Sequence, residues 1–453
     1  MALSAFKAYD VRGTVGEDLD EALVYRLGRA FARVVQPGMA VLGRDIRDSS
    51  EILQNALARG LMDEGVDVID IGLCGTEEVY FATDHLGAGG GCMVTASHNP
   101  IGDNGVKVIG PGARPITRAG GLEAMEALVE ADEFGAPVDT TGNMRKSDPR
   151  AAYVSRVLSF VNTDALRPLK ILVNAGNGAA GPTFDAIAAA MADVPVTFIT
   201  MHHAPDGSFP HGIPNPLLVE NQPVTGDAVR DHGADFGVAW DGDFDRCFLF
   251  DETGAFVDGE YIVGLLAAAI LARNPGARIV HDPRIIWNTQ RVVAQAGGEA
   301  VVSQTGHAII KEKMREVDAA YGGETSAHHY FRDFMYCDSG MIPWVLIAAH
   351  MSATGQTLSA LVGEMQRLHP SSGERNFRLL DPQAAVAAVE AQFSDGAEVD
   401  RLDGLSVSYP NWRFSLRRSN TEPVVRLNVE TRADPETLKA HTDAISAVLG
   451  SFS

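Results

Sequence analysis

Three segments of the chain repeat one order of hydrophobic and polar positions. Each has a short apolar run, a polar turn leading into helical periodicity, and a second apolar run; they span residues 39–72, 169–200 and 277–306. Such runs are typical of strands, and apolar positions three and four residues apart are typical of a helix. In the first segment we expect Ser49 or Ser50 as the N-cap and the helix end at Gly65. The segments begin more than a hundred residues apart, which excludes a short-period solenoid and predicts three successive α/β domains.

The pattern changes after Leu368 and Pro370. We expect a smaller α+β domain there, with helices over residues 383–393 and 435–450, a hairpin over 404–419 and a strand over 423–432. A chain of 453 residues is too long for one ordinary core. The predicted fold therefore has three related α/β domains and a smaller α+β C-terminal domain, with boundaries at residues 1–147, 148–252, 253–367 and 368–453.

The chain is acidic, with a formal net charge of −22. Nucleic acids and anionic membranes favour a basic face, so we expect neither as a partner. The four cysteines include no C-x-x-C pair, which argues against a zinc knuckle and suits a reducing compartment. The start lacks a signal-peptide pattern, and the longest apolar run, residues 261–272, is too short to span a bilayer and is expected to be a buried helix. These features predict a cytoplasmic enzyme or binding protein.

A serine lies where one predicted strand should end. An apolar stretch runs into T-A-S-H-N-P at residues 95–100, and turn formers at 102–105 precede a second strand over 106–109. Because Pro100 cannot continue a strand ladder, Ser97 is expected on a loop between two strands. Its hydroxyl would be exposed and well positioned, but nothing nearby in the sequence makes it reactive.

Three carboxylates alternate between two strand-like runs in D-G-D-F-D-R, at Asp241, Asp243 and Asp245. Carboxylates this close repel one another unless a cation offsets their charge, and a hard divalent metal is the natural partner. An EF-hand loop is rejected, because Arg246 stands where that loop needs glycine and strands flank the segment. The remaining alternative is a solvated acidic hairpin loop. Three ligands would leave positions for water or phosphate oxygens on Mg²⁺.

Two further stretches offer groups for a phosphorylated sugar. A turn between two strands combines a guanidinium, hydroxyls and an amide, which suits a phosphate dianion as well as it suits an ordinary polar turn: Arg417, Ser419, Asn420 and Thr421. Glu324 and Ser326 follow a Gly-Gly turn and could recognise sugar hydroxyls. The neighbouring His328 could be a metal ligand, an acid/base group or a satisfied core residue. His307 and Arg12 are individually weak signals.

Together these stretches resemble the α-D-phosphohexomutase superfamily over essentially the whole chain. T-A-S-H-N-P resembles its phosphoserine loop, D-G-D-F-D-R its metal loop, G-E-T-S-A-H-H its sugar loop and R-R-S-N-T-E-P its phosphate loop. The resemblance implies four domains around a central cleft, three of them related. With G-I-P-N-P-L-L, residues 212–218, and S-A-H-H-Y-F-R-D, residues 326–333, the motifs look most like those of bacterial phosphomannomutases, which supply mannose 1-phosphate for GDP-mannose.

The resemblance also implies roles for the candidate residues. Ser97 would carry a phosphoryl group whose oxygens complete the coordination of Mg²⁺ held by the three aspartates. A hexose 1,6-bisphosphate would be the intermediate and the activator, and the substrate would bind in two orientations. The implied catalytic groups are Ser97, Arg12, Lys107, His328 and His307; the implied substrate-binding groups are Arg246, Glu324, Ser326, Arg417, Ser419, Asn420 and Thr421; and His98, Asn99 and Pro100 would support the loop.

Several alternatives stay open at this point. A phosphoglucomutase or a dual-specificity enzyme competes with a phosphomannomutase, because Thr325 and Ala327 depart from the expected sugar loop. Phe244 replaces the common glycine of the metal loop. A catalytically silent sugar-phosphate or metal-binding protein, and a simple phosphatase, are the alternatives from other classes. The sequence leaves a monomer and a dimer equally open.

Overall fold

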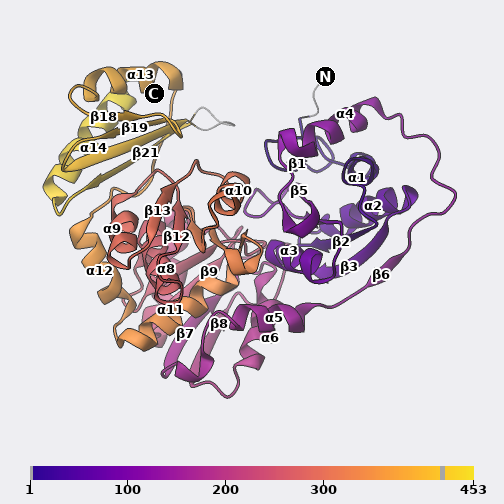
Figure 1. Cartoon of the computed structure of the whole chain (residues 1–453), viewed down its shortest axis with the longest axis horizontal. Helices are drawn as coiled ribbons and strands as arrows, with labels where there is room; N and C mark the ends of the chain where they lie inside the picture. Colours follow the sequence, from indigo (N-terminus) through magenta and orange to yellow (C-terminus); the bar gives the residue numbers. More distant parts are fainter. Residues whose placement is uncertain (1–3, 419–423, 453) are drawn as a thin grey trace. The chain divides into compact units, whose positions relative to one another are not determined.

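The computed structural model describes residues 4–418 and 424–452. Figure 1 labels the helices and strands of the whole chain. The chain divides into two compact units. The first unit comprises Met1–Phe256 and His328–Gly355, and the second comprises Val257–Ala327 and Gln356–Ser453.

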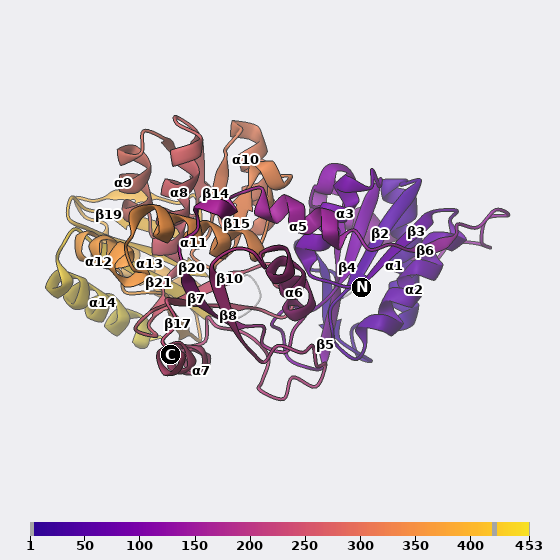
Figure 2. The same ribbon diagram turned by 90° about the horizontal axis from the view of Figure 1, so that it is seen from below.

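A mixed sheet forms the N-terminal part of the first unit, in the order β1-β5-β4-β2-β3-β6. Helices α1 and α2 lie on one face of this sheet and α3 lies on the other (Figure 2). The strands are β1 (Val11–Thr14), β2 (Met39–Arg44), β3 (Asp67–Leu73), β4 (Gly90–Val94), β5 (Asp103–Ile109) and β6 (Met144–Lys146). The α-helices are α1 (Glu21–Val35), α2 (Ser50–Asp63), α3 (Thr76–His85) and α4 (Glu123–Ala131), with short turns η1 (Pro111–Ala113) and η2 (Arg118–Leu122).

The first predicted strand-helix-strand segment forms β2, α2 and β3, with Ser49 as the N-cap of α2 and the two strands parallel. This prediction is confirmed. Strands β2 and β4 are also parallel neighbours, but the chain leaves β2 through α2 and leaves β4 directly into the antiparallel β5. In open α/β sheets, ligands bind outside the carboxyl ends of such diverging strands. The loop that carries Ser97 begins at this edge.

A second sheet in the first unit, ordered β11-β10-β9-β7-β8, contains the second predicted segment. Its β7, α6 and β8 confirm that segment, and β9 and β10 form an antiparallel hairpin in which Trp240 faces Cys247. The elements are α5 (Arg150–Leu158), η3 (Thr163–Ala165), β7 (Leu169–Asn174), α6 (Ala180–Ala190), β8 (Val196–Met201), η4 (Val219–Asn221), α7 (Gln222–His232), β9 (Phe236–Trp240), β10 (Cys247–Asp251) and β11 (Phe256–Val257). The unit also contains the pair β15 (His329–Phe331) and β16 (Cys337–Asp338), η5 (Arg332–Phe334) and α11 (Met341–Thr354).

The second unit contains the third predicted segment, as β12, α9 and β13, and the predicted C-terminal domain. Both predictions are confirmed: β12 pairs in parallel with β13 and β14, and an antiparallel sheet follows in the order β17-β21-β20-β19-β18. The elements are α8 (Gly259–Arg273), β12 (Arg278–His281), α9 (Trp287–Gln295), β13 (Glu299–Val302), α10 (His307–Val317), β14 (Tyr321–Gly323), α12 (Leu358–Leu368), β17 (Arg375–Arg378), α13 (Pro382–Phe393), β18 (Glu398–Asp400), β19 (Leu405–Ser408), β20 (Trp412–Arg418), β21 (Val424–Thr431) and α14 (Pro435–Gly450).

The long apolar run at residues 261–272 lies within α8, and most of its large side chains are buried. The expectation of a buried helix is therefore confirmed. In residues 4–418 and 424–452, no single helix is long and apolar enough to cross a membrane.

Candidate active site

Ser97 lies on the loop between β4 and β5, as predicted. The expectation of an exposed hydroxyl is wrong, because the residue is only 3% exposed. Its backbone adopts a φ of +50°, in the left-handed region that non-glycine residues rarely enter. The Ser97 Oγ donates a hydrogen bond to Asp241 Oδ2 at 2.7 Å and lies 2.9 Å from His98 Nδ1. The serine is thus held against the aspartate loop.

A buried arginine that the sequence reasoning missed holds the Ser97 loop. The Arg47 guanidinium donates to the backbone carbonyls of Ser97 at 3.0 Å, Asn99 at 2.6 Å, Pro100 at 2.8 Å and Asp103 at 3.0 Å. One planar fork with five N–H donors can satisfy several carbonyls that a folded-back loop turns toward one point. Arg47 stands in the polar turn after β2, but nothing local distinguished it from a solvated turn residue.

A second arginine supports the same loop from β1. Arg12 Nη1 donates to the side-chain oxygen of Asn99 at 2.7 Å, and Arg12 Nη2 pairs with Asp10 at 2.8 Å. Asn99 also donates to Asp103 at 3.0 Å. Burial alone would lower the pKa of Arg12, but Asp10 and then Asp243 raise it above its ordinary value. Arg12 is therefore a fixed cation beside the Ser97 loop.

The three aspartates form the turn of the β9–β10 hairpin, and each uses one carboxylate oxygen in a hydrogen bond. Asp241 Oδ2 accepts from Ser97, and Asp243 Oδ2 accepts from Thr76 Oγ1 at 2.6 Å. Lys107 Nζ lies 2.7 Å from both Asp243 Oδ2 and Asp245 Oδ2. Although burial lowers the pKa of Lys107, the two carboxylates raise it well above its usual range. Lys107 therefore stays charged, and Thr76 at the start of α3 is a further residue that sequence reasoning missed.

The other oxygen of each aspartate fits a metal ion. Oδ1 of Asp241, Asp243 and Asp245 is buried and accepts no hydrogen bond from any residue that the structure describes. The three side chains each offer a ligand atom within 4.8 Å of the other two. Buried acceptors without donors are costly, and three carboxylates this close repel one another. Carboxylate oxygens in this arrangement suit a hard divalent cation such as Mg²⁺.

Arg246 and His98 also adjoin Asp241. Arg246 Nε lies 3.6 Å from Asp241 Oδ2, and His98 Nδ1 lies 3.7 Å from the same oxygen. Burial raises the pKa of Asp241, but the neighbouring His98 and the Arg246 charge leave it below its ordinary value. Burial and Arg246 lower the pKa of His98. Asp241 is therefore an ionised carboxylate in a cationic setting.

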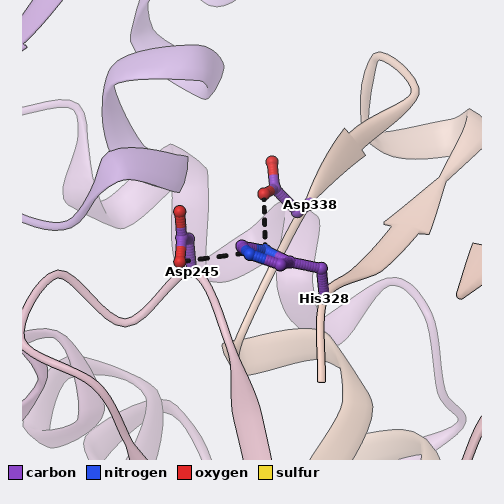
Figure 3. Close-up of side chains that lie close together, drawn as sticks. All are labelled: Asp245, His328 and Asp338. Carbon is purple, nitrogen blue, oxygen red and sulfur yellow. Dashed lines mark ion pairs between the residues drawn. The ribbon is translucent and has the colours of Figure 1, made fainter. Parts of the chain in front are cut away.

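His328 lies between two carboxylates, as Figure 3 shows. Its Nδ1 is 3.0 Å from Asp338 Oδ2 and 3.8 Å from Asp245 Oδ1. Burial lowers the pKa of His328, yet the charges of Asp245 and Asp338 raise it above its ordinary value. Asp338 was missed in the sequence, since it is placed there only by the pairing of β15 with β16. The pair places an imidazole beside the metal loop.

Phe244 departs from the family pattern in a position that suits glycine. Its φ is +43°, and its ring packs so closely on Gly75 that a Cβ there would lie 2.3 Å from Phe244 Cζ. Gly242 is equally constrained, since a Cβ on it would lie 2.5 Å from the Ser97 carbonyl oxygen. The buried phenyl ring thus offsets the strain of the left-handed backbone through packing against α3.

In the second unit, the sugar-loop residues surround a buried arginine. Arg284 Nη2 donates to Ser326 Oγ at 3.3 Å and lies 3.8 Å from Glu324 Oε2. Asp282 Oδ2 holds Arg284 at 2.7 Å and accepts from the Thr325 backbone N–H at 2.7 Å. The sequence predicted Glu324 and Ser326 as members of one sugar-binding loop. It gave no sign of Arg284 and Asp282, which lie in the turn after β12.

His307 is the first residue of α10, next to the Gly306 N–H that donates to Glu324 Oε2 at 3.1 Å. The structure therefore brings His307 and the sugar loop to one region of the second unit.

The predicted phosphate-binding arginine lies at the end of β20 in the same unit. Arg417 Nη1 contacts Thr305 Oγ1 and lies 3.6 Å from Asp403 Oδ2. Asp403 in turn accepts from the Thr305 backbone N–H at 3.2 Å. Burial and the Arg284 charge lower the pKa of Arg417. Its predicted companions, Ser419, Asn420 and Thr421, lie outside the described residues.

Comparison with known proteins decides the family. The four domains of the phosphoglucomutase/phosphomannomutase family match in order: alpha/beta/alpha domain I at residues 3–136, domain II at 151–254, domain III at 258–368 and the C-terminal domain at 374–448. The chain belongs to this family. The predicted fold class is thereby confirmed, and the chain is an isomerase of the phosphohexomutase class.

Individual relatives agree with the phosphohexomutase assignment over the whole length. The chain is 56% identical to a phosphomannomutase of Salmonella montevideo, over 99% of each chain. It is 54% identical to a protein of Xanthomonas campestris named phosphohexose mutases, over 99% of this chain and 100% of that one. Among solved structures, a family protein of Burkholderia thailandensis matches with a TM-score of 0.87 at 32% identity, over 100% of this chain and 98% of that one.

Proposed function

We propose that the chain interconverts mannose 6-phosphate and mannose 1-phosphate through a phosphorylated Ser97 and a hexose 1,6-bisphosphate. The observation that carries this is the buried Ser97 Oγ, hydrogen-bonded to one of three aspartates whose remaining oxygens lack donors among the described side chains. Several full-length relatives, 49–56% identical, are named phosphomannomutase. Such a product would feed the synthesis of GDP-mannose.

The proposed reaction moves one phosphoryl group at a time. A sugar hydroxyl attacks the phosphorus on Ser97, its new P–O bond forms as the Ser97 Oγ–P bond breaks, and its proton passes to a base. The second half runs the same change in reverse from the other end of the bisphosphate, and returns the phosphoryl group to Ser97. His328 is one candidate to move protons or balance charge in these steps, because it is buried beside the metal loop and its carboxylate neighbours can stabilise an imidazolium.

Asp241, Asp243 and Asp245 would hold Mg²⁺ together with an oxygen of the phosphorylated Ser97. When bound, the metal would neutralise charge on the transferring phosphoryl group. Lys107 and Arg12 are held as fixed cations beside the same loops, and we assign them to the same charge balance. Arg47, His98, Asn99 and Pro100 would hold the loop in its left-handed turn. Positioning of this kind is the protein's main contribution to phosphoryl transfer.

We assign substrate recognition to Arg246 and to groups of the second unit. Arg417, Ser419, Asn420 and Thr421 would bind the phosphate that is not reacting. His307 remains a weaker candidate for balancing phosphoryl charge or moving a proton; it follows Gly306, whose N–H donates to Glu324. Glu324 and Ser326 would read hydroxyls that occupy equivalent places in the two substrate orientations. Arg284 joins this set because it contacts Ser326 and adjoins Glu324. The domain boundaries at 147, 252 and 367 and a cytoplasmic location are further parts of the proposal.

A glucose-preferring or dual-specificity mutase is the second candidate, since Thr325 departs from the expected sugar loop. In this chain both the backbone N–H and, at 3.2 Å, the hydroxyl of Thr325 bond to Asp282, which also holds Arg284. Threonine at position 325 thus gives the sugar loop one more hydrogen bond to Asp282. That contact alone favours neither sugar.

The deciding experiment follows mannose 1-phosphate and glucose 1-phosphate side by side, with Mg²⁺ and a trace of the matching 1,6-bisphosphate. A strong preference for mannose supports the proposal, and comparable rates support the dual-specificity alternative. No isomerisation of either sugar, with binding retained, would leave a binding protein. Release of inorganic phosphate as fast as isomerisation would support a phosphatase. Ser97→Ala should abolish turnover while sugar-phosphate binding persists.

A further inference from the structure

The first unit contains a cavity that none of the residues assigned above to catalysis lines. It has a volume of about 520 Å³ and opens at the carboxyl ends of the parallel strands β2, β3 and β6. Its principal side chains are Arg44, Glu51, Gln54, Asp70, Lys146 and Arg150. Volumes of 300–1,000 Å³ are usual for small-molecule sites, and the carboxyl edge of an open α/β sheet is their usual place.

Three cationic side chains line the cavity, and two of them already have partners. Arg44 has an ion pair with Glu51 at 3.6 Å, but Glu51 is 71% exposed, so the pair is weak. Lys146, at the end of β6, is exposed. Arg150 Nη2 donates to the Leu73 carbonyl at 2.9 Å while its Nε holds Glu78. Guanidinium and ammonium groups around one opening bind phosphate oxygens well.

Hydrogen-bond acceptors line the same cavity. Gln54, which is 4% exposed, donates through Nε2 to Asp70 Oδ1 at 2.7 Å. A carboxylate only accepts, so this bond fixes the amide orientation. Gln54 Oε1 is then a buried acceptor without a donor in the described part of the chain. Together with the carboxylates of Asp70 and Asp148, it suits a ligand that carries hydroxyl groups.

We propose that this cavity binds a small phosphorylated sugar as an effector. The phosphate lies against Arg44, Lys146 and Arg150, and the sugar hydroxyls donate to Gln54 and the carboxylates. A ligand with both parts accounts for the mixed lining. The cationic side chains suit the phosphate, and the acceptors suit the sugar hydroxyls, which a phosphate ion alone lacks. Binding at this cavity goes beyond the proposed function, and only its effect on turnover rests on that function.

A chain of hydrogen bonds connects the cavity to the metal loop. Arg150 Nε donates to Glu78 Oε1 at 3.0 Å, and Glu78 Oε2 accepts from the Gly75 N–H at 3.0 Å at the start of α3. The next residue, Thr76, donates to Asp243 through its hydroxyl at 2.6 Å and its backbone N–H at 3.1 Å. A phosphate that draws Arg150 away from Glu78 loosens the N-terminus of α3 and changes how Asp243 is held.

The binding test uses the full-length Ser97→Ala protein, which does not turn over. Mannose 6-phosphate and GDP-mannose are titrated separately by calorimetry, with inorganic phosphate and mannose as the separate halves. We expect one of the two sugar phosphates to bind at a site whose Kd rises about tenfold or more in Lys146→Glu and Arg44→Glu, the size that loss of a charge-assisted contact predicts. The probe that responds identifies the source of the ligand.

The matched control is Arg145→Glu, since Arg145 is exposed on the same strand but does not line the cavity. It should leave the Kd unchanged. If neither probe responds to Lys146→Glu, or if Arg145→Glu weakens binding equally, the cavity site is wrong. A wild-type protein without mutase turnover would contradict the proposed function and leave this binding result unaffected.

The coupling is tested by the Mg²⁺ concentration that gives half-maximal turnover. In the wild type the responding probe should shift this concentration by about threefold, within the usual range of coupling between two sites. Glu78→Gln, and Glu78→Asp as a second variant should the first be unstable, should keep probe binding and lose the shift, because Glu78 does not line the cavity. A shift that persists in a folded variant shows that the path through Glu78 is wrong.

Discussion

The metal loop of the first unit and the arginine cluster of the second unit both gather buried charge, but they balance it in opposite ways. Around Asp241, Asp243 and Asp245, each carboxylate keeps one oxygen without a donor from the described residues. Around Arg284 and Arg417, the guanidinium groups already hold carboxylates. An anionic centre whose acceptors lack donors among the described residues suits a cation, whereas a paired cationic centre would have to give up its carboxylates in order to bind a phosphate.

The largest expected effect is a loss of turnover when one aspartate of the metal loop is replaced. Asp243→Asn removes one charge from the metal site and a partner from both Lys107 and Thr76, so kcat should fall by about a thousandfold or more, the scale of losing a metal's charge stabilisation. Steady-state rates and Mn²⁺ binding by paramagnetic resonance measure the two consequences. The control is Asp231→Asn on the exposed surface of α7. Normal metal binding in Asp243→Asn would contradict the assignment.

The next effect tests how the Ser97 loop is held. Arg47→Lys keeps the charge but cannot satisfy the carbonyls of Ser97, Asn99 and Pro100 together, so kcat should fall about 10- to 100-fold with KM little changed. The ratio of isomerisation to phosphate release should also fall, because a loosened phosphoserine is more open to water. Arg59→Lys, at an exposed position of α2, is the matched control. A loss of thermal stability with an unchanged ratio would mean that Arg47 is only structural.

A smaller effect tests the cationic centre. Asp403→Asn weakens the carboxylate that competes for Arg417, so KM for the sugar phosphate should fall about two- to fivefold, the size of a partly exposed ion pair. Asp400→Asn, on the neighbouring exposed strand β18, is the control. A higher KM in Asp403→Asn would show that Asp403 holds Thr305 and Arg417 in place for the ligand instead of competing with it.

The smallest effect concerns pH. Burial and the Asp258 carboxylate raise the pKa of Glu260 to about 8. The folded form therefore binds a proton that the unfolded chain releases near pH 4, and the stability this proton provides is lost as pH rises toward 8. The melting temperature should fall between about pH 5 and pH 8, and by a few degrees less in Glu260→Gln. Equal slopes for the two proteins would exclude Glu260 as the cause.

Sequence reasoning reached the strand-helix-strand segments and the four motif loops because each depends on neighbouring residues. The period of apolar positions predicts α2 and α9, and Pro100 with its turn formers predicts the loop of Ser97. The sequence predicted an exposed Ser97 hydroxyl, but the residue is buried. Burial of a loop residue depends on which distant segments pack over it, and the local sequence does not encode that. Arg47, Thr76, Asp338 and Arg284 were missed for the same reason, because only distant segments give them partners.

The sequence by itself determined the order of elements, the family and the residue types of the four loops, since local periodicity and short motifs encode them. Only the tertiary structure decided which carboxylate oxygens lack donors among the described residues, that the Arg47 guanidinium binds several carbonyls of the Ser97 loop, and that His328 faces Asp245 and Asp338. These facts depend on distances of about 3 Å between side chains far apart in the chain, and hydrogen bonds and ion pairs lose their strength steeply beyond such distances.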